Sequence, residues 1–368
     1  MRTRAARFTR ILSRLTDRRF LPVLGTLLTL VIMLILGQIF FSTRRGGFIS
    51  MPLFSNLLVD NSYLLLLAVG MTFVILTGGI DLSVGAVVAL VGLVIARLLT
   101  SGVPLIPTLI LAVLIGTSCG VLIGVMVQVF GIQPFIASLA VMFLARGLAN
   151  IVSVISIGIT IPANGRTDLY PGQAQFAALA SWSIKFGEGR GIWRITAPMI
   201  IAFTVITIAF LVLHYTRFGR TVYGLGQGDG GTAVQRMGLR PDISKITVYA
   251  VSGTCAGIAG LLFALYTRSG YCLSGLGMEL DAIAAVVIGG TLLAGGSGFV
   301  LGSVCGVFVY GLIQVLNARW GLQSWWAKVF IGAVLLVFVL LQRALTIQRT
   351  RRKQAALVMA DAIDPEFR

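Results

Sequence analysis

The sequence predicts an all-α fold, a polytopic bundle of membrane-spanning helices. Of its 368 residues, 57% are hydrophobic and only 11% are charged, whereas soluble domains contain about 25% charged residues. Apolar stretches of about 20 residues, long enough to cross a ~30 Å hydrocarbon core, recur along the chain. These stretches are continuous and do not alternate with period two, which argues against a membrane barrel.

The apolar pattern predicts about ten transmembrane helices within residues 21–342. The first follows a basic arm, residues 1–20, and is longer than a signal-peptide core, so we expect an uncleaved helix. The junctions at 77–81 and 295–298 are candidates for backbone inside the membrane, where non-helical chain needs surrounding protein or water. The ten predicted segments are 21–41, 62–77, 82–99, 109–130, 135–154, 197–214, 246–267, 279–294, 298–317 and 327–342.

Basic residues predict the orientation of the helices. The formal net charge is +17, and both the arm 1–20 and the tail 343–368 are basic. By the positive-inside rule both termini lie in the cytoplasm, and an even number of spans agrees. Loop 215–245 is then cytoplasmic, and loop 156–195 is external with an apolar helix near 174–184. The charge therefore indicates membrane topology and contact with anionic lipid, and not nucleic-acid binding.

Two local correspondences predict an inverted repeat. Residues 68–72 (AVGMT) of the second segment resemble residues 250–254 (AVSGT) of the seventh. The third and eighth segments each begin beside an aspartate, Asp81 and Asp281. With an odd number of segments in each half, the halves are inverted relative to each other, an arrangement that transporter folds use to build a central site.

Charged residues inside or at the edge of apolar segments mark a candidate pathway. A charge at mid-depth costs about 2.5–3.5 kcal/mol on insertion scales. The acids can line a polar path for a neutral, hydroxyl-rich solute, since carboxylates accept hydrogen bonds from adjacent hydroxyls. Alternatively, each acid caps a helix or fixes packing, and Arg146 pairs with an acid. The candidate pathway residues are Gly78, Gly79, Asp81, Ser83, Arg146, Glu279, Asp281, Gly289 and Gly290.

The sequence contains no catalytic or metal-binding pattern. It has one histidine and four widely spaced cysteines, and its glycine run 289–298 lacks the lysine of a phosphate-binding loop. We therefore assign no catalytic residue, no metal and no cofactor to this chain. Transport driven by ATP would require a separate ATPase chain.

The loop 215–245 is a second candidate site. The basic stretch TRFGR (216–220) ends a predicted helix, and Thr232–Gly238 (TAVQRMG) can form a short helix on the cytoplasmic face. This region is either an ordinary solvated loop or a docking element for a cytoplasmic partner.

Five stretches carry a family resemblance: TGGIDLSVG (77–85), ARG (145–147), TRFGR (216–220), RMG (236–238) and ELDAIAAVVIGGTLLAGGSG (279–298). Together they resemble the permease subunits of bacterial ABC sugar importers of the ribose, xylose and galactofuranose type. The resemblance covers roughly residues 50–342. It implies import of a monosaccharide, such as a pentose or a galactofuranose-like sugar, across the inner membrane by alternating access.

The resemblance also implies partners for this chain. They are a second, like or related permease subunit, a periplasmic sugar-binding protein, and two ABC ATPase subunits that use ATP and Mg²⁺. The family usually has Gly-Gly-Asn followed by two alanines where this chain has the longer, glycine-rich Gln227–Gly231. An ion-coupled secondary transporter that works through Asp81 or Glu279 is the alternative. The residues implied in ATPase coupling are Arg217, Gly219, Arg220, Thr232, Ala233, Arg236 and Gly238.

Overall fold

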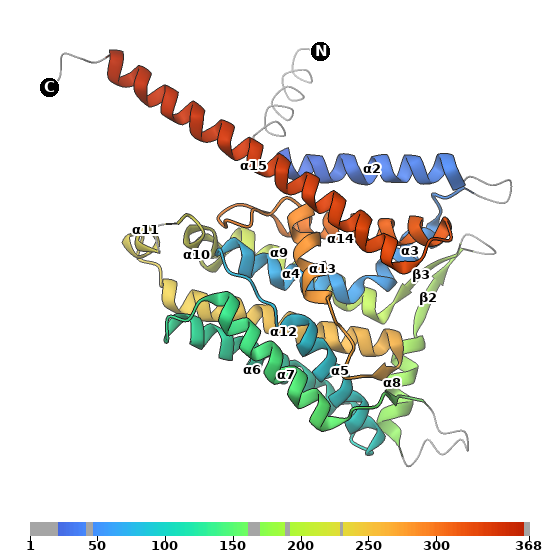
Figure 1. Ribbon diagram of the computed structural model, residues 1–368. Coiled ribbons are helices and arrows are strands. Elements are labelled where there is room, and N and C mark those ends of the chain that lie inside the picture. Colours follow the sequence, from blue (N-terminus) through green and yellow to red (C-terminus); the bar gives the residue numbers. More distant parts are fainter. Residues whose placement is uncertain (1–20, 42–46, 161–169, 188–191, 229–230, 364–368) are drawn as a thin grey trace, which may run out of the picture.

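The computed structural model describes residues 21–41, 47–160, 170–187, 192–228 and 231–363. In chain order the elements are α2 (Leu21–Phe41), α3 (Met51–Asp60), α4 (Ser62–Leu76), α5 (Val84–Thr100), α6 (Leu105–Gln128), α7 (Pro134–Val152), β1 (Ile157–Gly158), α8 (Pro171–Ser181), β2 (Ser183–Phe186), β3 (Trp193–Thr196), α9 (Ala197–Tyr215), α10 (Arg217–Leu225), α11 (Thr232–Arg236), α12 (Pro241–Thr267), β4 (Ser269–Gly270), α13 (Met278–Ile288), α14 (Val300–Arg319) and α15 (Ser324–Ile363). Long helices lie side by side (Figure 1). We call the end with α10 and α11 the inner end, and the end with β2 and β3 the outer end.

The predicted helical bundle is confirmed, and each of the ten predicted segments contains a helix. Among the described residues, seven helices are long and apolar enough to cross a membrane alone. The pair α3–α4, bent by 59°, makes eight spans when counted as one. Helices α5 and α13 are shorter, with 17 and 11 residues. At 1.5 Å per residue α13 is only about 16 Å long, roughly half of the hydrocarbon core.

Several predicted boundaries differ from the structure. The segment 279–294 ends early, because α13 stops at Ile288 before a glycine pair. Helix α15 continues beyond the predicted segment 327–342 to Ile363, through residues with good helix propensity. The helix predicted near 174–184 is confirmed as α8, but the antiparallel β2–β3 hairpin beside it was not predicted. The basic arm 1–20 lies outside the described residues.

Helices α4 and α12 pack side by side in opposite directions. Tyr63 near the start of α4 contacts Phe263 near the end of α12, with ring centroids 5.1 Å apart. Midway, a side chain at Gly70 would meet the Cβ of Cys255 at 2.9 Å. Tyr249 of α12 reaches the inner end of α4, where its hydroxyl lies against Gly79. The two helices therefore run antiparallel along their length, as an inverted repeat requires.

Glycines explain how closely the central helices approach. A Cβ at Gly116 or Gly120 of α6 would collide with the backbone of α12 around Gly253. On α14, Gly306 lies in the same way against the backbone of α13 at Ala285. Small residues permit such contacts in lipid, where packing replaces the hydrophobic drive between helices. The central helices are therefore tightly packed at these glycines.

The two short helices begin at a common point inside the bundle. Non-helical residues 77–83 follow α4 and lead to α5, whereas residues 268–277 follow α12 and lead to α13. Gly85 at the start of α5 abuts the carbonyl of Gly275 and the carboxylate of Glu279 at the start of α13. We call this meeting point the junction. The units α4–α5 and α12–α13 thus have matching order and opposite direction, in agreement with the predicted inverted repeat (Figure 1).

Candidate functional site

Asp81 holds the non-helical residues before α5 against α12. Its side chain is completely buried. One oxygen accepts hydrogen bonds from the Ser83 backbone N–H at 2.9 Å and the Ser83 hydroxyl at 2.7 Å. The other accepts a hydrogen bond from the Ser252 hydroxyl of α12 at 2.8 Å. Both oxygens are satisfied, so the bonds offset the cost of burying this carboxylate.

Glu279 lies on the opposite side of the junction, and its surroundings are less complete. Its Oε1 accepts a 3.2 Å hydrogen bond from the Gly277 N–H. Its Oε2 is buried against Gly85 and has no hydrogen-bond partner in the described part of the chain. The residue as a whole is partly exposed. This oxygen is an unused acceptor that a solute would meet only after α5 and α13 move apart at Gly85.

Arg146 of α7 supports the chain segment that leads into α13. Its Nη1 donates hydrogen bonds to the carbonyls of Cys272 at 2.8 Å and Ser274 at 2.6 Å. The expected pair with an acid is therefore replaced by contacts to carbonyls, although the charge of Glu279 acts on the guanidinium. The physical reason is that residues 271–277 are not helical, so their buried carbonyls need donors from elsewhere.

The remaining pathway candidates fall into two places. Asp281 lies in the first turn of α13 and is partly exposed. The glycines lie toward the inner end: Gly78 and Gly79 follow α4, and Gly289 and Gly290 follow α13. The two glycine pairs flank one contact, in which the Gly296 N–H donates to the Leu76 carbonyl at 2.8 Å. Gly79 and Asp81 remain neighbours in the non-helical stretch before α5, whereas Gly289 and Gly290 lie at the opposite end of α13 from Glu279.

The helix α10 is amphipathic and carries the basic residues of the predicted cytoplasmic loop. Thr216 caps it by accepting a hydrogen bond from the Gly219 N–H at 3.3 Å. Arg217 and Arg220 are exposed, whereas Val222 and Leu225 are buried. Its exposed face is therefore a basic surface at the inner end.

The short helix α11 packs on α10. A side chain at Gly224 would meet Val234 at 2.6 Å. Thr232, Arg236 and Gly238 are exposed, while the side chain of Ala233 lies outside the described part. The helix ends at Arg236, two residues before the predicted end at Gly238.

Sequence reasoning missed Gly226, which joins α10 to both broken units. A Cβ there would collide with the Leu76 carbonyl at the end of α4 and with the Gly296 backbone beyond α13. The end of α10, the end of α4 and the loop after α13 are therefore in close contact at Gly226. Ser252 was also missed as a partner of Asp81, although it lies in the AVSGT stretch that indicated the repeat.

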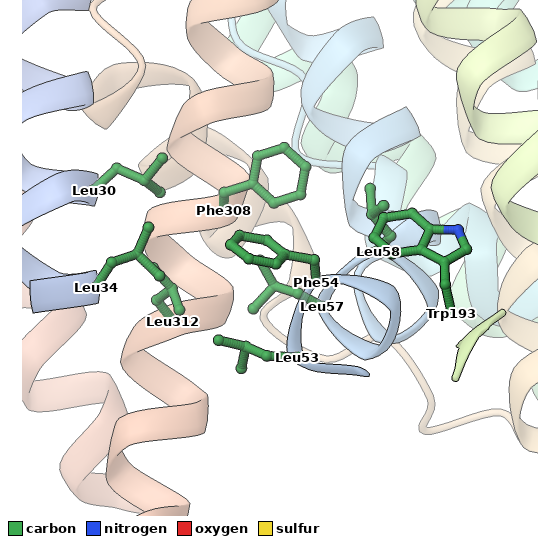
Figure 2. Close-up of a pocket in the computed structure, with 9 residues that line it drawn as sticks. All are labelled: Leu30, Leu34, Leu53, Phe54, Leu57, Leu58, Trp193, Phe308 and Leu312. Carbon is green, nitrogen blue, oxygen red and sulfur yellow. The ribbon is translucent and has the colours of Figure 1, made fainter. Parts of the chain in front are cut away.

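A cavity of about 270 Å³ near the outer end is lined by leucine, phenylalanine and tryptophan side chains (Figure 2). In Figure 2 the indole nitrogen of Trp193 is on the side of the ring away from Leu30 and Leu34. Sugar sites combine apolar surface with a few converging polar groups, so this cavity does not suit a sugar. Its lining residues are Leu30, Leu34, Leu53, Phe54, Leu57, Leu58, Trp193, Phe308 and Leu312.

The described residues include no group of three or more His, Cys, Asp or Glu side chains placed to hold a metal ion. The four cysteines are free thiols. The chemistry available at the junction is hydrogen bonding by a carboxylate, which suits the passage of a solute.

The chain is similar to known permease proteins. Residues 53–339 match the family model described as branched-chain amino acid transport system, permease component. The fructose import permease protein FruG of Bifidobacterium longum (strain NCC 2705) is 40% identical over 332 residues, which are 89% of this chain and 92% of the relative. The inner membrane ABC transporter permease protein YjfF of Escherichia coli (strain K12) is 39% identical over 340 residues, 92% of this chain and 96% of the relative.

The ribose import permease protein RbsC of Escherichia coli (strain K12) is 35% identical over 299 residues, 81% of this chain and 88% of the relative. No solved structure matches the chain.

Proposed function

We propose that this chain, which belongs to the permease-component family of branched-chain amino acid transport systems, imports a monosaccharide as the membrane subunit of an ABC transporter. It is a transport component and not an enzyme. The family description mentions amino acids, but the relatives FruG and RbsC are named for fructose and ribose. The junction carries the proposal, because opening it would offer the buried, unpaired Oε2 of Glu279 as an acceptor to a neutral, hydroxyl-rich solute.

The basic surface of α10 and α11 is the proposed docking site for an ATPase chain. That chain binds ATP and Mg²⁺ and supplies the energy, so the permease itself needs no cofactor. Movement of α10 acts through Gly226 on the inner ends of α4 and the loop after α13. Alternating access then follows as the two broken units, α4–α5 and α12–α13, tilt against each other around the junction.

The remaining partners are assigned by position. The inner end faces the cytoplasm with both termini, and exposed arginines there contact anionic lipid of the bacterial inner membrane. A sugar-binding protein delivers the solute at the outer end, which carries α8 and the β2–β3 hairpin. A second permease subunit, of the same or a related chain, completes the core. The similarity to an ABC transporter permease argues against the alternative of ion-coupled transport.

The proposal is tested by uptake into liposomes. The complex of this chain with its ATPase and sugar-binding protein is expected to accumulate radiolabelled D-fructose or D-ribose, and only when ATP is supplied on the ATPase side. Accumulation of either sugar by this chain alone, without nucleotide, would contradict the proposal. So would a complete, ATP-hydrolysing complex that transports an amino acid and neither sugar.

A further inference from the structure

The apolar cavity near the outer end lies between elements from distant parts of the chain. Leu30 and Leu34 of α2 form one wall, with Phe308 and Leu312 of α14 beside them (Figure 2). Helix α3 and Trp193 of β3 lie on the opposite side. The cavity is therefore a space between α2 and the rest of the bundle.

This cavity has a buried floor and a more exposed rim. The floor consists of leucines of α3 and α14 that are at most 8% exposed, namely Leu53, Leu57, Leu58 and Leu312. The rim residues are partly exposed, so a ligand can enter from the surface of the bundle. They are Leu30, Leu34, Phe54, Trp193 and Phe308.

The chemistry of the lining disfavours water and favours hydrocarbon. Leucine and phenylalanine side chains carry no polar atom, and the indole nitrogen of Trp193 is on the side of the ring away from Leu30 and Leu34. A buried water needs about two to four polar partners, whereas an apolar cavity of about 150 Å³ stays dry and binds benzene. A cavity of about 270 Å³ accommodates a longer hydrocarbon group, which restores the dispersion contacts that an empty cavity lacks.

Helix α2 is held near both ends, which keeps its middle part away from α3. Near the inner end, the Thr26 hydroxyl donates a hydrogen bond to the carbonyl of Ile288, the last residue of α13. Near the outer end, Oε1 of Gln38 accepts a hydrogen bond from the Ile49 N–H at 2.9 Å. The cavity lies between these two attachments.

Another face of α2 is apolar and exposed along the length of the helix. Its residues recur at helical spacing and are Leu28, Ile32, Ile35 and Ile39. Since α2 is long and apolar enough to cross a membrane, this face lies against lipid chains. Membrane lipid is therefore the hydrocarbon that surrounds α2 and reaches the rim of the cavity.

Two cations lie next to Trp193 on the β2–β3 hairpin. Lys185 and Arg194 are exposed and directly opposite each other in the antiparallel register. Like charges in such a pair repel, so an anionic group beside them is favourable. The hairpin is attached to α3, because the Ser55 hydroxyl donates a hydrogen bond to the Arg194 carbonyl at 2.8 Å. Positive charge is thus fixed near the cavity at the outer end.

We propose that the cavity binds one acyl chain of an anionic phospholipid from the outer leaflet, with the phosphate group at Lys185 and Arg194. The chain fills the space between α2, α3 and α14 and joins α2 to the bundle. Trp193 lies where the acyl chain meets the headgroup, a position that tryptophan favours at membrane interfaces. This inference does not depend on which solute the protein imports.

The first test measures the fluorescence of Trp193 in the full chain, reconstituted in phosphatidylcholine bilayers. The other four tryptophans, Trp182, Trp320, Trp325 and Trp326, are replaced by phenylalanine. Bromine atoms on an acyl chain quench tryptophan on contact. We expect phosphatidylglycerol with brominated chains to quench most of the Trp193 emission even as a minor component of the bilayer.

Variants that fill the cavity locate the quenching chain. Leu57→Phe and Leu312→Phe each enlarge a floor residue, and either one should abolish most of the quenching while the protein stays folded. Leu28→Phe is the matched control, because it makes the same change on the exposed face of α2. It should keep the wild-type quenching.

The headgroup is tested by its charge. Brominated phosphatidylcholine should need about a tenfold higher mole fraction for half-maximal quenching, the difference expected for cations near the membrane surface. The double variant Lys185→Gln and Arg194→Gln should remove this preference and keep the quenching itself.

Three outcomes would overturn the proposal. Emission that brominated phosphatidylglycerol leaves unquenched would show a dry cavity or one covered by a second copy of the chain. Wild-type quenching in the folded Leu57→Phe and Leu312→Phe proteins would place the lipid outside the cavity. Equal quenching by the two brominated lipids would contradict the phosphate site at Lys185 and Arg194.

Discussion

Asp81 and Glu279 belong to the two opposed units α4–α5 and α12–α13, yet their surroundings differ. Asp81 is completely buried, and both of its oxygens accept hydrogen bonds. Glu279 is partly exposed, and among the described residues its Oε2 has no hydrogen-bond partner. All hydrogen bonding of Asp81 therefore serves the fold, whereas Glu279 has one oxygen that the described fold does not use.

This difference shows that two units in an inverted arrangement can use their acids for different purposes, one for stability and one for transport. The α4–α5 unit uses its acid to hold non-helical backbone in place inside the membrane. In the α12–α13 unit, Arg146 stabilises the non-helical backbone instead, by donating hydrogen bonds to the carbonyls of Cys272 and Ser274. Glu279 is not needed for that purpose. The comparison predicts that loss of Asp81 reduces stability, while loss of the Glu279 charge reduces transport.

Replacing Asp81 by alanine is expected to have the largest effect on stability. The change leaves the Ser83 N–H and the hydroxyls of Ser83 and Ser252 without their acceptor. Each unsatisfied buried group costs about 1–3 kcal/mol, so the total loss is about 3 kcal/mol or more. Thermal unfolding of the purified chain in detergent measures it. Ser252→Ala removes only one of the three bonds and should cost about a third as much. An Asp81→Ala protein as stable as wild type would contradict the stabilising role of Asp81.

Enlarging Gly85 tests the junction itself. An alanine there would collide with the Gly275 carbonyl and the Glu279 carboxylate. Overpacking of this kind costs about 1–3 kcal/mol. Gly147→Ala in α7 is the matched control, because its Cβ would meet nothing within 4 Å. A melting temperature that falls for Gly85→Ala and holds for Gly147→Ala confirms the close contact, while equal stability of the two variants would contradict it.

Replacing Arg146 by lysine sharpens the other half of the comparison. Lysine keeps the charge, but its side chain is shorter. Its ammonium therefore does not reach the position of Nη1, the nitrogen that donates to both carbonyls. We expect a loss of about 1–2 kcal/mol, the magnitude of one hydrogen bond from a charged donor. Hydrogen exchange of the backbone amides in residues 271–277 measures the local effect. Unchanged exchange in that segment would show that Arg146 does not support it.

The sequence predicted the helices because they depend on local composition. Apolar runs identify each membrane segment. It also identified Asp81 and Glu279, since acids in apolar surroundings are unusual. The TGGIDLSVG stretch even located the non-helical residues before α5.

The partners of these residues could not be predicted, because they come from distant parts of the chain. Asp81 is bound by Ser252, which is 171 positions away, and Arg146 is bound to Cys272, which is 126 positions away. Burial depends on the same contacts, so the free oxygen of Glu279 had no signal in the sequence.

The most direct test of the account is the variant Glu279→Gln in the reconstituted complex. The substitution keeps the size of the side chain and removes its charge, and we expect a change in stability below about 1 kcal/mol because few bonds are lost. Import of D-fructose or D-ribose per ATP hydrolysed should fall about tenfold, while the melting temperature stays at the wild-type value. Wild-type import per ATP, or a loss of import matched by a loss of folded protein, would contradict the role assigned to Glu279.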